Sequence, residues 1–133
     1  MKKSRGLRNN NPGNIRHGAS KWVGLVPGDD SAFCTFSEMK YGYRAMIKLL
    51  QNYKKLHGCD TIRKIINRWA PPNENNTPAY VLYVAGRMGK SPDVDIDVND
   101  KGTMVALAAA ISAMENGEPA VVSDIEAGWE TLT

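Results

Sequence analysis

The segment from Met104 to Met114 constrains the fold most, because it is almost wholly apolar and rich in alanine. Asp100 precedes it, and Asn116-Gly117 follows it as a stop signal. A helix that is apolar on most sides has to be surrounded by other elements. The sequence therefore predicts a central, buried helix with the rest of the chain packed around it.

Three more helices are predicted where apolar residues recur every three or four positions. Their expected spans run from Ser37 to His57-Gly58, from Asp60 or Thr61 to Pro71-Pro72, and from Thr77-Pro78 to Gly89. Ser123 and Glu126 have the spacing of a capping box, which predicts a last short helix. The acidic segment 91–99 between these helices is expected to be an extended connector.

The first third of the chain has a different pattern. Residues 8–16 concentrate Asn, Pro and Gly, which is typical of a structured loop. Apolar residues 22–26 and the alternating segment 33–36 flank a Pro-Gly-Asp-Asp turn, which predicts a small β-hairpin. The expected fold class is therefore mainly α, of the α+β kind, with a small hairpin near the N-terminus.

Length and composition limit the classes of protein further. A chain of 133 residues, 42% hydrophobic and 23% charged, fits one domain over residues 1–133. It contains no apolar run long enough for a membrane span, and polar residues follow its basic start where a signal peptide would be apolar. We therefore expect synthesis in the cytoplasm without a signal peptide.

The two cysteines, Cys34 and Cys59, are 25 positions apart and form no CxxC motif, so reduced thiols are expected. The chain has no P-loop, no GxGxxG and no zinc-ligand spacing. Neither a metal nor a cofactor is therefore expected.

Charge is unevenly distributed along the chain. Residues 1–68 carry 14 Lys or Arg and 4 Asp or Glu, whereas residues 69–133 carry 3 and 10. The basic half is able to face an anionic polymer, or the two halves pair within the fold. Because the basic residues are dispersed over several predicted helices, a nucleic-acid partner is not expected.

Glu115 is the most informative polar residue, because it continues the apolar stripe of Met104, Ala108 and Ile111 at helical spacing. Burial and the negative end of a helix dipole both disfavour an ionised carboxylate, which suits a general acid. The alternative is a solvated glutamate at an exposed helix end. No second carboxylate forms an evident pair with it.

Basic and aromatic residues early in the chain are candidates for lining a groove. They are Arg16, His17, Trp22, Tyr41 and Tyr43. Trp22 and Tyr43 also lie among hydrophobic residues, so packing in the core is the alternative for these two. Neither histidine has a nucleophile or metal-spaced partner in the sequence.

Several motifs occur in an order that resembles a known family. They are RGLRNNNPGNIR, W-x-G from Trp22, F-x-x-F with G-x-R-A from Phe33, TIRKIINRWAPPNENNTPAYVLYV, and AAISAMENGEP. This order resembles the phage and prophage virion proteins known as structural protein P5-like. The resemblance covers nearly the whole chain and implies a cell-wall lytic enzyme of the lysozyme-like class.

Three short segments are also similar to glucosaminidases and lytic transglycosylases of the lysozyme superfamily. Residues 110–117 resemble their catalytic Glu segment, residues 11–15 their glycan-binding hairpin, and residues 33–44 the helix that follows. The order is rotated here. The similarity therefore implies a circularly permuted lysozyme-like domain, which is feasible because chain termini often lie close together at the surface.

The resemblance implies particular roles for single residues. Glu115 would be the general acid, and Tyr80 would resemble the tyrosine that faces the catalytic glutamate. Asn11 and Asn14 would belong to the glycan-binding hairpin, with Arg16 and Trp22 as further substrate-binding candidates. Glu74 and Asn75 are candidates for groove contact, with loop closure as the alternative role.

The expected function is cleavage of the β-1,4 bond between N-acetylmuramic acid and N-acetylglucosamine in peptidoglycan, by a lytic transglycosylase or a muramidase. The alternative is a non-catalytic phage virion or glycan-binding structural module. Expected partners are peptidoglycan strands, and components of a virion or secretion apparatus. Delivery to the cell wall would follow phage release or such an apparatus.

Overall fold

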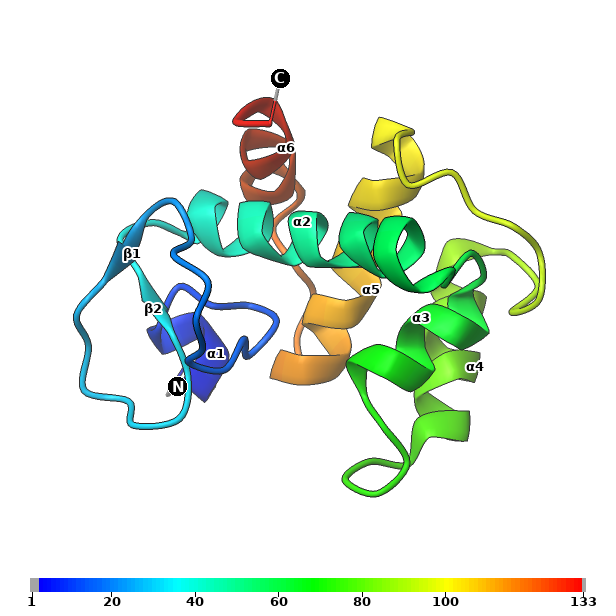
Figure 1. The fold of residues 1–133 in the computed structure, drawn as a ribbon, viewed down its shortest axis with the longest axis horizontal. Helices are drawn as coiled ribbons and strands as arrows, with labels where there is room; N and C mark the ends of the chain where they lie inside the picture. Colours follow the sequence, from blue (N-terminus) through cyan, green and yellow to red (C-terminus); the bar gives the residue numbers. More distant parts are fainter. Residues whose placement is uncertain (1–2, 133) are drawn as a thin grey trace.

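Helix α5 (Lys101–Asn116) runs through the middle of the molecule in the computed structural model, which describes residues 3–132. Around it lie seven further elements. They are α1 (Arg5–Arg8), β1 (Leu25–Val26), β2 (Thr35–Phe36), α2 (Met39–His57), α3 (Ile62–Trp69), α4 (Thr77–Met88) and α6 (Val122–Glu130). Helix α2 crosses the molecule with the hairpin near its start and α3 near its end (Figure 1).

The central position of α5 follows from its composition. Leu107, Ala108 and Ile111 are wholly buried, and α4 and α6 pack against the helix. The Asp100 carboxylate caps its start by accepting the Thr103 N–H, and Gly117 ends it at a φ of 70°. The prediction of a central, buried helix with these two boundaries is confirmed.

Helix ends were easier to predict than helix starts. Gly58 and Gly89 end α2 and α4 in the left-handed conformation, as predicted. Thr61 caps α3 by accepting the Lys64 N–H, which confirms one of the two predicted starts.

The other three predicted caps are wrong. Glu38 occupies the N-cap position of α2 without a side-chain capping bond, while the N–H of Ser37 donates to the carbonyl of Gly24. The residue that caps α4 is Asn76, because the hydroxyl of Thr77 donates to the carbonyl of Ala70 instead. Helix α6 begins at Val122, one residue before the predicted capping box.

The hairpin is antiparallel and shorter than predicted. Leu25 pairs with Phe36 and Val26 with Thr35, whereas Phe33 bridges to Arg16 on the opening loop. The opening segment thereby becomes attached to the hairpin. The predicted fold class, mainly helical with a small hairpin near the N-terminus, is confirmed.

Apolar side chains form two clusters. The larger one joins α2, α3, α4, α5 and α6, and the smaller one contains Ile15, Cys34, Phe36 and Ala45 under the hairpin. Both cysteines are buried free thiols, Cys34 in the smaller cluster and Cys59 in the larger.

The two oppositely charged halves of the chain pair in part. Arg63 of α3 binds Asp93 of the acidic connector, with Nε donating to Oδ1 at 2.7 Å and Nη2 to Oδ2 at 3.1 Å.

Among residues 3–132, no helix combines the length and the apolar character that crossing a lipid bilayer requires.

Asp30 anchors the opening loop to the hairpin. Its carboxylate accepts two hydrogen bonds from Arg5, at 2.6 and 2.7 Å, and further bonds from the Asn9 amide and the N–H groups of Ala32 and Phe33. The Arg5 guanidinium, helped by these donors, holds the pKa of Asp30 well below its ordinary value.

An Asp30→Asn variant is expected to have a lower melting temperature than the wild type at pH 7. A depressed folded-state pKa stabilises the fold above the unfolded value of about 3.9, and this contribution is lost as the pH falls below about 4. Thermal melts followed by circular dichroism at pH 7 and pH 3 test this. A difference between variant and wild type that is equally large at both pH values would contradict it.

Candidate active site

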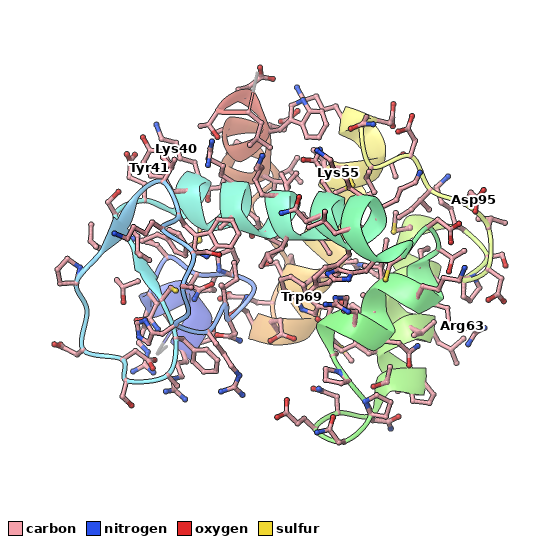
Figure 2. All side chains as sticks on the ribbon, in the orientation of Figure 1. Lys40, Tyr41, Lys55, Arg63, Trp69 and Asp95 are labelled. Atoms are coloured by element: carbon pink, nitrogen blue, oxygen red, sulfur yellow. The ribbon has the colours of Figure 1, made fainter. Side chains whose placement is uncertain are left out.

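A cleft of about 640 Å³ lies where the opening loop, α2, the α3–α4 loop and the end of α5 meet. Its lining consists of Gly13, Asn14, Ile15, Arg16, Phe33, Leu49, Tyr53, Trp69, Ala70, Glu74, Asn75 and Glu115. Leu49 and Tyr53 come from α2, and Trp69 lies near the C-terminal end of α5 (Figure 2). The cleft therefore brings together segments that are far apart in the sequence.

The Glu115 carboxylate is held on both of its oxygens. The amide Nδ2 of Asn14 donates to Oε1 at 3.0 Å, and the hydroxyl of Tyr80 donates to Oε2 at 2.9 Å. The glutamate is half-buried, so the apolar stripe of α5 is interrupted at its last turn by a polar group in the cleft. Two neutral donors thus fix the orientation of one carboxylate.

Tyr80 reaches Glu115 from the first turn of α4 and is itself buried. Burial raises the pKa of Tyr80 far above its ordinary value, and the neighbouring Glu115 charge and their hydrogen bond act in the same direction. The bond between Thr77 and Ala70 holds this turn of α4 against the end of α3. Tyr80 is therefore a fixed hydrogen-bond donor that keeps its proton.

Asn14 reaches Glu115 from the opening loop. Its φ of 50° lies in the left-handed region, which asparagine tolerates better than most residues. While Nδ2 bonds to Glu115, the Oδ1 atom is buried without a hydrogen-bond partner in the part of the chain that the structure describes. This loop conformation places an amide directly beside the carboxylate.

Asn116 fastens the end of α5 to the opening segment. Its amide Nδ2 donates to the carbonyls of Pro12 and Ser112, both at 2.9 Å, and its Oδ1 accepts from the Ser4 hydroxyl at 2.6 Å. The residue next to Glu115 therefore connects two segments about a hundred positions apart in the sequence.

Trp69 forms one wall of the cleft and packs edge-on against Tyr53, with ring centroids 6.3 Å apart. The opening loop approaches this wall closely, because a Cβ atom on Gly13 would lie 2.8 Å from the Trp69 ring. Only glycine fits at that position without displacing the indole. The loop and the aromatic wall therefore define the width of the cleft at this point.

The structure brings together most of the residues predicted for the site. Arg16, Glu74, Asn75 and Glu115 line the cleft with Asn14, and Tyr80 lies behind Glu115.

Two predicted substrate-binding residues do not line the cleft. Asn11 is wholly buried, and its amide bonds to the backbone of Ile15 and Cys34, so it stabilises the loop. Trp22 packs against the smaller apolar cluster under the hairpin. Both assignments are corrected accordingly.

Sequence reasoning missed several residues of the site. Trp69 lies on the apolar side of its predicted helix, which indicates packing and not a cleft wall. Phe33 belongs to the alternating strand segment and to a family motif, and neither predicts that it lines the cleft. Asn116 belongs to the segment 110–117, but no nearby residue predicts its bonds to Pro12 and Ser4.

The donor set of the cleft is suited to proton transfer. Among residues 3–132, no group of three His, Cys, Asp or Glu side chains is arranged to hold a metal ion. The cleft instead offers one oriented carboxylate, its two neutral donors, and apolar ring surfaces.

Fold and cleft together define a class: a mainly helical α+β protein with one oriented glutamate in a cleft between distant chain segments. No protein-family profile matches the chain. Protein P5 of Pseudoalteromonas phage PM2 is 38% identical over 132 residues, an alignment that covers 96% of this chain and 81% of the phage protein. The chain therefore belongs to the family of phage PM2 protein P5.

Proposed function

We propose that this protein is a peptidoglycan-cleaving glycosidase that acts on the β-1,4 bond between N-acetylmuramic acid and N-acetylglucosamine. One observation carries the proposal: the Glu115 carboxylate lies in a cleft and is oriented on both oxygens by Asn14 and Tyr80. A positioned carboxyl group is what proton transfer to a glycosidic oxygen requires. The Tyr53 and Trp69 rings add flat apolar surface for sugar rings.

Glu115 would act first as an acid and then as a base. The protonated carboxyl gives its proton to the glycosidic oxygen while the bond from that oxygen to the muramyl C1 breaks. The carboxylate then takes a proton from the group that attacks C1. In a transglycosylase this group is the C6 hydroxyl of the same muramic acid, and in a muramidase it is water.

The Asn14 amide is able to hydrogen-bond to Glu115 both before and after a proton transfer. Asn14 donates to the carboxylate through Nδ2, and a half-turn of its amide would present the unpartnered Oδ1 as an acceptor for the carboxylic acid. Asn14 would thereby keep Glu115 oriented throughout the cycle.

Glu74 is the other carboxylate among the lining residues, and it lies on the exposed α3–α4 loop. Transglycosylation needs only Glu115, whereas hydrolysis also needs a group that orients water. Glu74 is the lining carboxylate that we propose for this role. The chemical form of the product therefore reports which route operates.

The test is mass spectrometry of soluble products from purified peptidoglycan, with and without borohydride reduction. Borohydride changes the mass of free reducing muramyl ends and leaves 1,6-anhydro ends unchanged. Anhydro products that persist in a Glu74→Gln variant would assign the transglycosylase route. Reducing ends that disappear in that variant would assign hydrolysis with Glu74 as the water-orienting group.

Absence of any soluble product from folded wild-type protein would overturn the proposal. A non-catalytic phage virion or glycan-binding structural module would then be the better account. Circular dichroism of the same preparation establishes that the protein is folded.

A Tyr80→Phe variant is expected to cleave peptidoglycan about tenfold more slowly, because Glu115 loses one of its two orienting donors. Phenylalanine keeps the buried ring, so the melting temperature should change little. Tyr83→Phe is the matched control, since Tyr83 lies on the same helix and does not line the cleft. Initial rates of muropeptide release measure both, and equal rates for Tyr80→Phe and wild type would contradict the role of Tyr80.

A further inference from the structure

Arg16 lies in the same cleft as Glu115, at the point where the opening loop joins the hairpin. Its guanidinium carbon lies 5.1 Å from the centroid of the Phe33 ring, and the residue is exposed. The backbone bridge between Arg16 and Phe33 fixes the two residues relative to each other. The guanidinium is therefore held against an aromatic ring at the edge of the cleft.

A second arginine contacts the same ring but differs in its partners. The Arg5 guanidinium lies 4.5 Å from the Phe33 centroid and is bound to Asp30 through two hydrogen bonds. For Arg16, residues 3–132 provide neither an ion pair nor a side-chain hydrogen bond. Arg16 therefore keeps a planar fork of N–H donors that matches two oxygens of an oxyanion.

The charges of the other lining residues restrict where an anionic group can bind. Arg16 is the single basic residue among those that line the cleft, whereas Glu74 and Glu115 are the two acidic residues there. A carboxylate on a bound strand is repelled at both glutamates and attracted at Arg16. Arg16 is therefore the one lining side chain whose charge attracts a carboxylate of a bound strand.

We propose that Arg16 binds a carboxylate of the glycan strand and makes the cleft select acidic β-1,4 glycans over neutral ones. This inference rests on the proposed function, in which the strand is peptidoglycan. Peptidoglycan offers carboxylates from two alternative sources. They are the lactyl group of a muramic acid without a peptide, and the stem peptide, whose attachment converts that lactyl carboxyl group to an amide. Chitin-type strands have the same backbone linkage and neither group.

Binding, measured without turnover, tests the inference. Calorimetric titration of Glu115→Gln protein would compare three soluble oligosaccharides: chitin-type, muramic acid-containing with free lactyl groups, and muramic acid-containing with stem peptides. Adding Arg16→Gln to the Glu115→Gln protein is expected to weaken binding of the acidic strands about tenfold. The ratio of the affinity for acidic strands to the affinity for the chitin-type strand should fall by the same factor. Arg16→Lys should retain part of the preference, since it keeps the charge without the fork.

The three ligands distinguish the two sources of carboxylate. A tenfold loss with free lactyl groups identifies the lactyl carboxylate, and a loss restricted to peptide-bearing strands identifies the stem peptide. Arg68→Gln is the matched control, because Arg68 also lies over a cleft aromatic ring, that of Tyr53, but does not line the cleft. Its binding should equal that of the parent protein.

The outcomes separate this inference from the proposed function. Equal loss on neutral and acidic strands, or no loss on either, overturns the role of Arg16 even if the wild type cleaves peptidoglycan. An acidic preference that depends on Arg16 in a protein that releases no product supports the role of Arg16 and overturns the glycosidase proposal. Failure of all three strands to bind overturns the role of Arg16, while product release by the wild-type protein decides the glycosidase proposal separately.

Discussion

A Glu115→Gln variant is expected to cleave peptidoglycan about 1,000-fold more slowly than the wild type, because the substitution removes the one group proposed to donate and accept the proton. Glutamine has the same size and still accepts a hydrogen bond from Asn14, while its amide is able to donate to the Tyr80 hydroxyl. Since Glu115 is half-buried in the cleft, the fold should be retained. The rate of muropeptide release measures the loss.

Glu118→Gln is the matched control for this variant. Glu118 is exposed, follows Glu115 by three positions and is absent from the cleft lining, so its substitution should leave the rate unchanged. If Glu115→Gln retains a tenth or more of the wild-type rate with an unchanged melting temperature, another residue is the acid.

An Asn11→Ala variant is expected to lose about 3 kcal/mol of unfolding free energy. The Asn11 amide donates to the carbonyls of Ile15 and Cys34 and accepts the N–H of Ile15, each at 2.9 Å in a wholly buried position. Alanine leaves these backbone groups without partners, and each such loss is costly in a dry interior. For a domain of this size the melting temperature should fall by roughly 10 °C.

Urea unfolding followed by circular dichroism measures the change in Asn11→Ala. Asn73→Ala provides the control, because Asn73 lies exposed in the α3–α4 loop and its substitution should change stability by less than about 0.5 kcal/mol. A loss below about 1 kcal/mol for Asn11→Ala would mean that water or a shifted backbone replaces the amide.

Helix identity and helix ends were predictable because they depend on local chemistry. The apolar spacing of a helix and the left-handed glycine that ends it lie within the same short segment of the chain. The glycines Gly58, Gly89 and Gly117 end α2, α4 and α5 in this way. The starts were less predictable, since a polar side chain can choose a partner outside its own helix. Thr77 bonds to the carbonyl of Ala70, so Asn76 caps α4 instead.

Residues of the candidate site were predictable only where a local residue pattern or the resemblance to a family indicated them. Glu115 was visible from its stripe, and the resemblance indicated Tyr80 as a tyrosine that faces it, where the structure has the Tyr80 hydroxyl. Asn14 was predicted only as a residue of the glycan-binding hairpin, and its bond to Glu115 came from the structure. Asn11 was assigned to the cleft because a loop motif does not reveal which amide points inward. The position of Trp69 in the cleft wall was not predicted. Helical periodicity separates a buried face from an exposed face, and it does not identify a residue at the border between them.

The contacts that close the cleft have a consequence for the timing of folding. Ser4 bonds to Asn116 and Asn14 to Glu115, so the site joins the first residues of the chain to residues more than a hundred positions later. Contacts of such large sequence separation form late, because they require a long segment of chain to be ordered first. During synthesis the growing chain has no assembled cleft until the end of α5 has emerged and docked on the opening segment.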